Sequence, residues 1–350
     1  MLNLTDRQLK ILEFVKNTNG AGNKQILEYL KDEKNNISRA TTVRDINVLL
    51  DKGLIKKEGA GRNVKYFIKT GNPLLSFFDI EKYFAKAPDQ REIPYERFNF
   101  DIFKNLKNIF TSDELLLMNN LTEKYRSRIK KISPVIFKKE LERLTIELSW
   151  KSSQIEGNTY TLIDTEILLK EHKEAKGHPK EEAIMLLNHK NALEYILDKK
   201  SDFKRITLRK IENIHSLLIK NLNVEKGLRN IPVGITGTKY RPLDNGHQIR
   251  EAVEKLIHTI NKTSDPFTKT LIAMIMISYI QPFEDGNKRT SRLLGNALLF
   301  SHNICPLSFR SINEAEYKKA VILFYEQNSA LYFKELFIEQ FKFANENYFL

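Results

Sequence analysis

A chain of 350 residues has room for two or three domains that each bury a core of their own. Its formal net charge of +13 at pH 7 predicts an acidic partner, with nucleic acid as the first candidate, although a generally lysine-rich surface would give the same excess. The single cysteine, Cys305, excludes an internal disulfide bond and a metal site built from several cysteines.

The first residues of the chain lack the pattern of a signal peptide. The apolar run Leu271–Ile280 is well short of the ~20 residues that cross a bilayer, and no other run is longer. We therefore expect a cytoplasmic protein with no membrane partner.

Residues 1–70 have the pattern of three short helices followed by a hairpin. Thr5 and Gln8 form a capping-box pair at the first helix. By apolar periodicity the three helices are expected at residues 5–17, 23–31 and 39–52. A glycine-containing turn then joins two strand-like segments, 54–58 and 64–68, which indicates a β-hairpin.

This order of elements resembles a winged helix-turn-helix domain. The third helix is expected to bury Val43, Ile46, Leu49 and Leu50. Its outer face and the wing carry residue types that contact phosphates and base edges in a major groove: Arg39, Thr41, Thr42, Arg44, Asn47, Arg62 and Lys65. Asp45 shares that face and is expected to be a solvated surface residue. These residues favour DNA as the partner, and a protein-interaction or dimerisation module is the alternative.

Residues 71–99 contain three prolines and predict a linker, whose apolar residues indicate that it is docked. Helical periodicity dominates the remainder, so the fold class is mainly α, with a winged helix followed by an all-helical domain at residues 100–350. The helices are expected at about 101–109, 112–130, 134–155, 165–172, 180–199, 208–219 and 248–261, and on both sides of the loop after residue 280. Residues 313–343 also have helical periodicity.

The stretch 281–292, QPFEDGNKRTSR, lies between two apolar runs and has what a phosphate cradle at a helix start requires. Gly286 lets the backbone turn, and the amides that follow can point at an anion where the helix dipole favours negative charge. Asp285 can hold a hard divalent cation through oxygen. Three cations supply the countercharge: Lys288, Arg289 and Arg292.

This stretch resembles the signature of the Fic (Fido) family, His-x-Phe-x-Asp/Glu-Gly-Asn-Gly/Lys-Arg-x-x-Arg, and agrees with it at every specified position except the first. Members of that family bind ATP and typically transfer AMP to a hydroxyl of a target protein. The resemblance implies that Asp285 binds Mg²⁺ and that Phe283 anchors the loop. It further implies that the nucleotide phosphates are held by the backbone around Gly286, Asn287 and Lys288 and by the side chains of Arg289 and Arg292.

The first position of the signature, which holds the catalytic His in the family, is Gln281 in this chain. An amide can keep a hydrogen bond to a hydroxyl but cannot take its proton. Because general base catalysis typically contributes ~10²–10⁴-fold, we expect AMP transfer to be weak or absent. His247 is the one histidine near an expected active-site element, whereas His215 and His258 fit packing or surface positions.

A second motif lies at the end of the helix expected at 134–155. Ser152, Glu156 and Gly157 resemble the family's inhibitory motif, Ser/Thr-x-x-x-Glu-Gly/Asn, with an inhibitory helix at about 135–157. Gly157 suits a helix C-terminus, and a carboxylate there can fork onto a guanidinium. The resemblance implies that Glu156 pairs with Arg292 in the space of the ATP γ-phosphate.

Residues 227–242 have strand-like composition with glycine and proline punctuation. They resemble the family's flap, a β-hairpin beside the active site whose edge aligns a target peptide by strand addition. The flap residues are expected to be Gly237, Thr238, Lys239, Tyr240 and Arg241.

Two functions are compatible with these features. In the first, the protein is a regulator whose winged helix binds DNA and whose Fic-like domain binds ATP or another nucleotide. The alternative is an active protein adenylyltransferase, autoinhibited by Glu156, that modifies a protein target. The intact Asp285, Arg289 and Arg292 argue against a nucleotide-free interaction module, and a homodimer is compatible with either function.

Overall fold

The computed structural model describes residues 4–18, 20–31, 37–69 and 71–350. The chain divides into two compact units, Met1–Ala85 and Lys86–Leu350, so the predicted linker 71–99 is shared between them. Within the described residues, no helix combines the length and the apolar character needed to cross a membrane.

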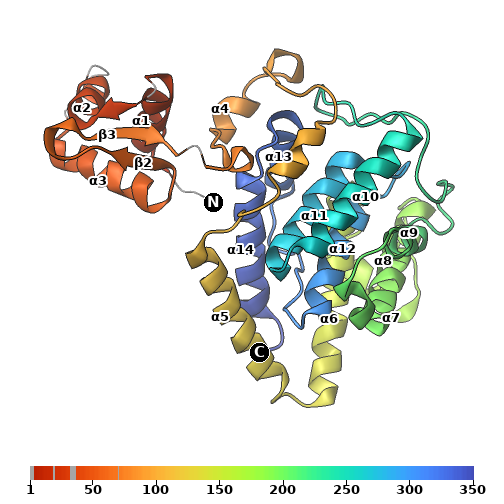
Figure 1. The fold of residues 1–350 in the computed structure, drawn as a ribbon. Helices are drawn as coiled ribbons and strands as arrows, with labels where there is room; N and C mark the ends of the chain where they lie inside the picture. The colour runs from red at the N-terminus through yellow and green to blue at the C-terminus, as the bar shows by residue number, and fades with distance from the viewer. Residues whose placement is uncertain (1–3, 19, 32–36, 70) are drawn as a thin grey trace. The chain divides into compact units, whose positions relative to one another are not determined.

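The first unit has the predicted three helices, α1 (Asp6–Asn17), α2 (Asn23–Lys31) and α3 (Arg39–Asp51), and the predicted hairpin, β2 (Ile55–Glu58) and β3 (Lys65–Ile68). The short strand β1 (Ala21–Gly22), which was not predicted, pairs with β3, so the antiparallel sheet has the order β1-β3-β2 (Figure 1). The predicted capping box of Thr5 and Gln8 is present. A 3₁₀ turn (Pro73–Leu75) and α4 (Ile80–Phe84) complete the unit.

The buried face of α3 differs from the prediction. Thr42 and Asp45 are buried, and the Thr42 hydroxyl donates to the Ser38 carbonyl, so placing Thr42 among the DNA-contacting residues was wrong. Asp45 is buried because α1 satisfies its carboxylate: Arg7 pairs with one oxygen, and Gln8 donates to the other at 3.0 Å. Apolar periodicity cannot reveal a carboxylate that receives its donors from another helix.

Most of the other residues predicted to contact DNA are at least partly exposed. Four of them are exposed, namely Arg39, Arg44 and Asn47 on α3 and Lys65 on the wing. Thr41 is partly exposed. The side chain of Arg62 lies outside the described residues.

The second unit is helical, as predicted, with 3₁₀ turns at Pro88–Gln90, Phe100–Lys104 and Lys200–Lys204. Its α-helices are α5 (Ser112–Ile129), α6 (Pro134–Gln154), α7 (Leu162–Glu171), α8 (Lys180–Asp198), α9 (Leu208–Leu218), α10 (Gly246–Lys262), α11 (Pro266–Ile280), α12 (Asn287–Ser301), α13 (Glu314–Gln327) and α14 (Leu331–Asn347).

The helical periodicity of residues 313–343 is confirmed: they form α13 and part of α14, which are separated at Asn328, where φ is a left-handed 49°. Two predictions for this unit were wrong. The helix expected at 101–109 is only the 3₁₀ turn Phe100–Lys104. The predicted hairpin at 227–242 is an extended loop without strands, apart from one isolated bridge between Arg241 and Arg97. Glycine and proline punctuation predicted extended backbone correctly, but it could not show that the loop pairs with residues 96–97 instead of with itself.

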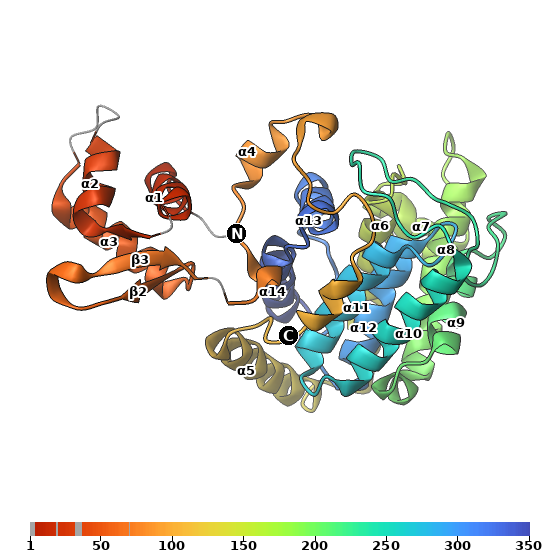
Figure 2. The same cartoon turned by 45° about the horizontal axis from the view of Figure 1, so that its top comes forward.

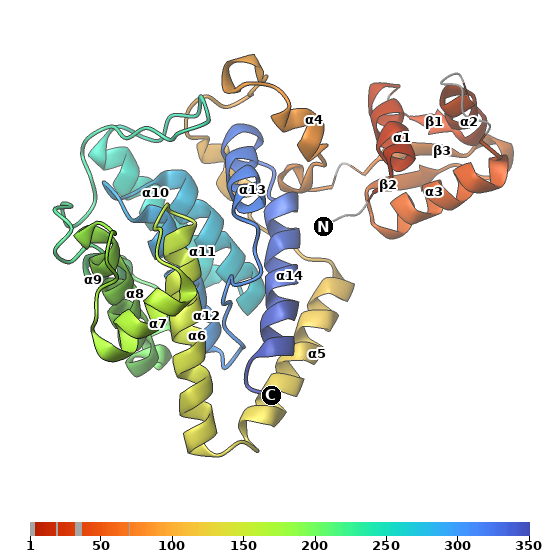
Figure 3. The ribbon, with the colours of Figure 1, turned by 180° about the vertical axis from the view of Figure 1, so that it is seen from behind.

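The core of the second unit is the antiparallel pair α11 and α12. Every residue of α11 from Phe267 to Ile280 is buried, which fits a helix that is apolar on all sides. Figures 1 and 2 show this pair flanked by α13 and α14 on one side and by α8 and α9 on the other, and Figure 3 shows α6 from behind. The loop 281–286 that joins the two central helices is therefore held at both ends by the core.

The two central helices pack closely at Gly295. A Cβ atom there would lie 2.7 Å from Cγ of Met274, closer than packed side chains allow. One turn earlier on α12, the Ser291 hydroxyl donates to the Met274 carbonyl at 2.7 Å. This close approach sets where α12 begins relative to the end of α11.

We expect Gly295→Val to lower the free energy of unfolding by about 1–3 kcal/mol, because the added side chain overpacks the contact with Met274. Urea denaturation followed by circular dichroism measures the change. The matched control is Gly234→Val, since a Cβ at this exposed loop position meets no atom within 4 Å. An unchanged stability for Gly295→Val would contradict the close-packing argument.

Candidate functional site

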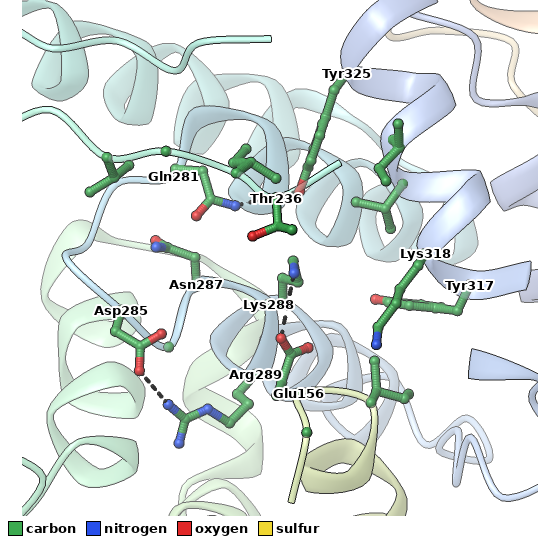
Figure 4. A pocket seen from close by; sticks show the side chains of 18 of the residues that line it. Glu156, Thr236, Gln281, Asp285, Asn287, Lys288, Arg289, Tyr317, Lys318 and Tyr325 are labelled. Atoms are coloured by element: carbon green, nitrogen blue, oxygen red, sulfur yellow. Dashed lines mark hydrogen bonds and ion pairs between the residues drawn. The ribbon is translucent and has the colours of Figure 1, made fainter. Parts of the chain in front are cut away.

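A cavity of about 470 Å³ lies where α11 ends and α12 begins. Figure 4 shows the side chains that line it. Its walls come from five places: the end of α6, Met185 of α8, the loop 233–236, the predicted signature stretch and α13. The structure thus brings together two motifs that are far apart in the sequence, Glu156–Gly157 and residues 281–289.

The loop between α11 and α12 is fixed by its own residues. The Asn287 side chain accepts from the Phe283 amide and donates to the Phe283 carbonyl, both at 2.8 Å. Gly286 has a left-handed φ of 77° and precedes α12 without a side-chain cap among the described residues. The first amides of α12 are therefore available at the cavity, where the helix dipole favours an anion.

His215 of α9 packs against this loop, a contact that the sequence did not reveal. Its ring stacks on buried Phe283 with centroids 3.7 Å apart, and Nε2 donates to the Asp285 carbonyl at 2.9 Å. Burial lowers the pKa of His215 to about 4, so the ring is neutral at pH 7. Its expected packing role is confirmed. The contact with the loop could not be predicted, because it joins elements far apart in the chain.

Two buried arginines of α12 supply positive charge. Arg289 pairs with Asp285 at 2.9 Å, and Arg292 donates through Nε to the Ser152 hydroxyl at 2.9 Å and through Nη2 to the Ser152 carbonyl at 2.7 Å. Burial lowers the pKa of Arg289 despite the nearby Asp285 carboxylate. Within the described residues, Nη1 of Arg289 is buried and has no hydrogen-bond partner. An anion in the cavity would supply one.

Glu156 lies at the cationic end of the cavity (Figure 4). Its carboxylate is 2.9 Å from Arg292 Nη2, so the predicted contact is present, and 3.5 Å from Lys288 Nζ, a contact that was not predicted. Burial acts to raise the pKa of Glu156, but the charges of Arg292 and Lys288 outweigh it and hold the pKa below its ordinary value. Gly157, with a left-handed φ of 101°, lies in the turn that follows α6, which ends at Gln154.

Gln281 lines the cavity. The sequence comparison with the Fic signature placed this glutamine where the family has its catalytic histidine. Its side-chain amide donates to the Ser278 carbonyl at 2.6 Å and to the Tyr325 hydroxyl at 3.4 Å. Burial raises the pKa of Tyr325 well above its ordinary value, so this neighbour stays protonated at neutral pH. Among the described residues that line the cavity there is no histidine, and His247 lies exposed at the start of α10.

The residues predicted for the flap lie beside the cavity wall, and Val233–Thr236 form the wall itself. Tyr240 is buried and donates to the Tyr279 carbonyl at 2.8 Å, and Thr238 donates to Glu326 at 2.6 Å. The Arg241 amide donates to the Glu96 carbonyl at 2.8 Å. Residues 237–241 therefore anchor the loop.

The sequence also missed the residues that α13 contributes. Tyr317, Lys318 and Tyr325 line the cavity, and the Tyr317 ring lies 5.6 Å from the Arg292 guanidinium. Tyrosines in an apolar helical pattern are expected in the core, so only the packing of α13 against α11 shows which of them reach the cavity.

No described group of three or more His, Cys, Asp or Glu residues gathers into a metal centre. The exposed carboxylate of Asp285 is suited to Mg²⁺, because this ion is commonly held by one or two carboxylates together with substrate phosphates. The residues present therefore fit a metal that arrives with an anionic ligand.

Comparison with known proteins agrees with this geometry. Residues 205–299 match the Fic/DOC family, and residues 4–73 match the penicillinase repressor family. The chain resembles two solved structures. Fic-1 from C. elegans has a TM-score of 0.57 and 18% sequence identity, and the match covers 67% of this chain and 70% of that one. A Fic domain containing signaling protein from Bacteroides thetaiotaomicron has a TM-score of 0.55 and 20% sequence identity, and the match covers 65% of this chain and 95% of that one. At these identities the likeness shows the fold.

Two curated relatives carry names of enzymes. A probable protein adenylyltransferase of Aquifex aeolicus is 35% identical over 104 residues, which are 28% of this chain and 31% of the relative. Protein adenylyltransferase Fic of Drosophila grimshawi is 28% identical over 174 residues, which are 48% of this chain and 35% of the relative. The chain thus spans about a third of the length of these relatives.

The fold and the site define a helical domain in which the start of α12 and the Glu156 carboxylate line one cavity. Residues 205–299 form a Fic/DOC domain, and residues 4–73 form a winged-helix domain of the penicillinase repressor type.

We expect the free energy of unfolding to fall as the pH drops from 6.5 toward 4, partly because of His215. Unfolded His215 takes up a proton near pH 6.5, whereas the folded residue does so only near pH 4, so the unfolded chain binds more protons in this interval. The loss attributable to His215 is up to about 3 kcal/mol.

His215→Gln should therefore weaken the pH dependence of stability, as measured by urea denaturation at pH 7 and at pH 4.5. The control is His247→Gln, which alters an exposed histidine and should leave the dependence unchanged. Equal pH dependence in both variants would show that His215 is not held neutral.

Proposed function

We propose that this protein is a regulator in which the Fic/DOC domain binds ATP or another nucleotide and the winged helix binds DNA, with AMP transfer weak or absent. The observation that supports it best is a cavity that has buried cations and free helix amides for phosphates but holds Gln281 where a base would be needed. The relatives named protein adenylyltransferases favour ATP as the ligand, and the exposed Asp285 carboxylate favours a divalent metal beside it.

The cavity offers a separate contact for each part of such a ligand. The amides at the start of α12 and the side chain of Arg289 would hold phosphates, and Asp285 would hold Mg²⁺. Arg292 would receive the terminal phosphate once Glu156 has left it. Mg²⁺ would neutralise phosphate charge; the chain's own groups bind and orient the nucleotide.

Gln281 limits what can happen after binding. Its amide is occupied by the Ser278 carbonyl and has no basic atom that could remove the proton of an attacking hydroxyl. Losing general base catalysis lowers the rate by ~10²–10⁴-fold. Binding contacts remain intact, so we infer a protein that holds a nucleotide without transferring it efficiently.

The winged helix carries the second half of the proposal. Arg39, Arg44 and Asn47 are exposed on one helix, and Lys65 is exposed on the wing. Such residues reach phosphates and base edges when a recognition helix lies in a major groove. Nucleotide binding and DNA binding in one chain are what a regulator requires.

The contact between Glu156 and two cations favours a second candidate function. A carboxylate that fills the phosphate end of the cavity would restrain AMP transfer to a protein target, and restraint implies an activity to be restrained. In this alternative the protein is an active adenylyltransferase that Glu156 holds off.

The two candidates are separated by Glu156→Gly and by Glu156→Gly/Gln281→His. We expect Glu156→Gly to bind Mg²⁺-ATP at least roughly tenfold more tightly than the unaltered chain, because an anion no longer occupies the cationic end. Isothermal titration calorimetry measures binding, and label from α-labelled ATP on protein measures transfer. The regulator proposal expects transfer only from the double variant.

The control is Glu156→Gly/Arg292→Ala, which should lose the gain in affinity because it lacks the terminal-phosphate contact. Label transferred by Glu156→Gly alone would establish the adenylyltransferase alternative. Absence of ATP binding by Glu156→Gly would overturn both.

DNA binding is tested by its salt dependence on a mixed-sequence duplex. Replacing Arg39 and Arg44 by Ala should weaken binding and lower the slope of log K against log salt by about 0.9 for each phosphate that the variant no longer neutralises. Arg205→Ala changes an exposed charge in the second unit and serves as the control. Binding that is unaffected by the α3 variants, or no salt-dependent binding at all, would refute this half of the proposal.

A further inference from the structure

Arg91 joins the cavity to a segment outside the Fic/DOC match. Its guanidinium donates to the Gly237 carbonyl and lies 3.1 Å from the Glu326 carboxylate. Both side chains are buried, Arg91 at 4% and Glu326 at 0% exposure. A charged pair removed from water to this extent holds its geometry firmly, because moving either group would leave a buried charge poorly compensated.

The same carboxylate also accepts from the Thr238 hydroxyl at 2.6 Å. Three segments therefore meet at one ion pair: the segment that contains Arg91, the loop at 237–238, and the last turn of α13. Glu326 directly follows Tyr325, which lines the cavity, and Gly237 directly follows Thr236, which also lines it. The ion pair thus sets the spacing between the loop 233–236 and α13.

Further contacts hold the segment itself in place. Gln327 of α13 donates to the Glu92 carbonyl at 2.7 Å, and the Arg241 amide donates to the Glu96 carbonyl at 2.8 Å. At its far end the Asn99 amide donates to the Tyr279 hydroxyl at 3.0 Å. These hydrogen bonds hold in place the backbone segment that carries Arg91.

The cavity has two parts, and different contacts hold each of them in place. The phosphate end is built by the start of α12 and is held by α11, Asn287 and His215. The opposite wall is largely apolar and is built by Val233 and Ile235 on the loop and by Val321 and Ile322 on α13. Only this second wall depends on the Arg91–Glu326 pair, and an apolar wall of this kind suits a flat base rather than a phosphate.

We propose that Arg91 is a positioning residue for the nucleoside part of the bound nucleotide: it fixes the two sides of the apolar wall at the separation that the base requires. This inference rests on the proposed nucleotide binding and goes beyond it, since Arg91 lies outside residues 205–299 and contacts Gly237 and Glu326.

The test compares Mg²⁺-ATP with inorganic tripolyphosphate, both measured by isothermal titration calorimetry on the full chain carrying Glu156→Gly. Arg91→Met/Glu326→Gln removes the ion pair without leaving a buried charge, and glutamine at 326 can still accept from Thr238. We expect its affinity for ATP to fall about tenfold, while its affinity for tripolyphosphate, which needs only the cradle, is unchanged.

Two milder variants and a control accompany it. Arg91→Lys keeps the charge without the guanidinium fork and should recover part of the ATP affinity, and Thr238→Val removes one hydroxyl link and should give a smaller loss of the same kind. The control is Arg97→Met/Asp244→Asn, which removes a neighbouring ion pair that is mostly exposed. It should bind both probes as the parent does.

Unchanged ATP affinity in the Arg91 and Thr238 variants would overturn the inference. Equal losses for ATP and tripolyphosphate would also overturn it, because they would indicate a general structural role. If the Glu156→Gly parent bound neither probe, the proposed function would fail first and the inference with it, which distinguishes the two failures.

Discussion

The guanidinium of Arg292 is completely buried, and a charge removed from water requires an opposite charge and hydrogen-bond acceptors at close range. The end of α6 supplies both, through the Glu156 carboxylate and through the hydroxyl and carbonyl of Ser152. The need of buried Arg292 for these partners therefore determines where α6 ends. It also explains why the cavity contains a carboxylate at all: in the absence of another anion, Glu156 is the group that neutralises this end.

Two kinds of interaction shape the rest of the cavity: close packing of helices and a buried ion pair. The phosphate cradle is part of the core, because α11 and α12 are in close contact and His215 stacks beneath the loop that joins them. The apolar wall opposite is made from a loop without strands and one helix, and a buried ion pair holds them together. One half of the cavity thus depends on the packing of the core, and the other half depends on a few long-range contacts.

Prediction from the sequence succeeded where the signal is local. The helix start at Thr5 and the charged stretch 281–292 follow from short motifs with fixed spacing. The pairing of Glu156 with Arg292 was implied by the resemblance to the Fic family and is present. Prediction failed where a residue's environment is supplied by distant parts of the chain. Asp45 was expected on the surface and is buried, because donors on α1 satisfy its carboxylate.

The sequence by itself determined the mainly helical fold class and the two kinds of domain, because helix periodicity and capping act over only a few neighbouring residues. The tertiary structure decided that 227–242 is a loop, that His215 supports the cradle, and that Lys288 joins Arg292 in holding Glu156. Each of these depends on side chains from separate elements meeting in space. Such meetings follow from how the helices pack, which no short motif encodes.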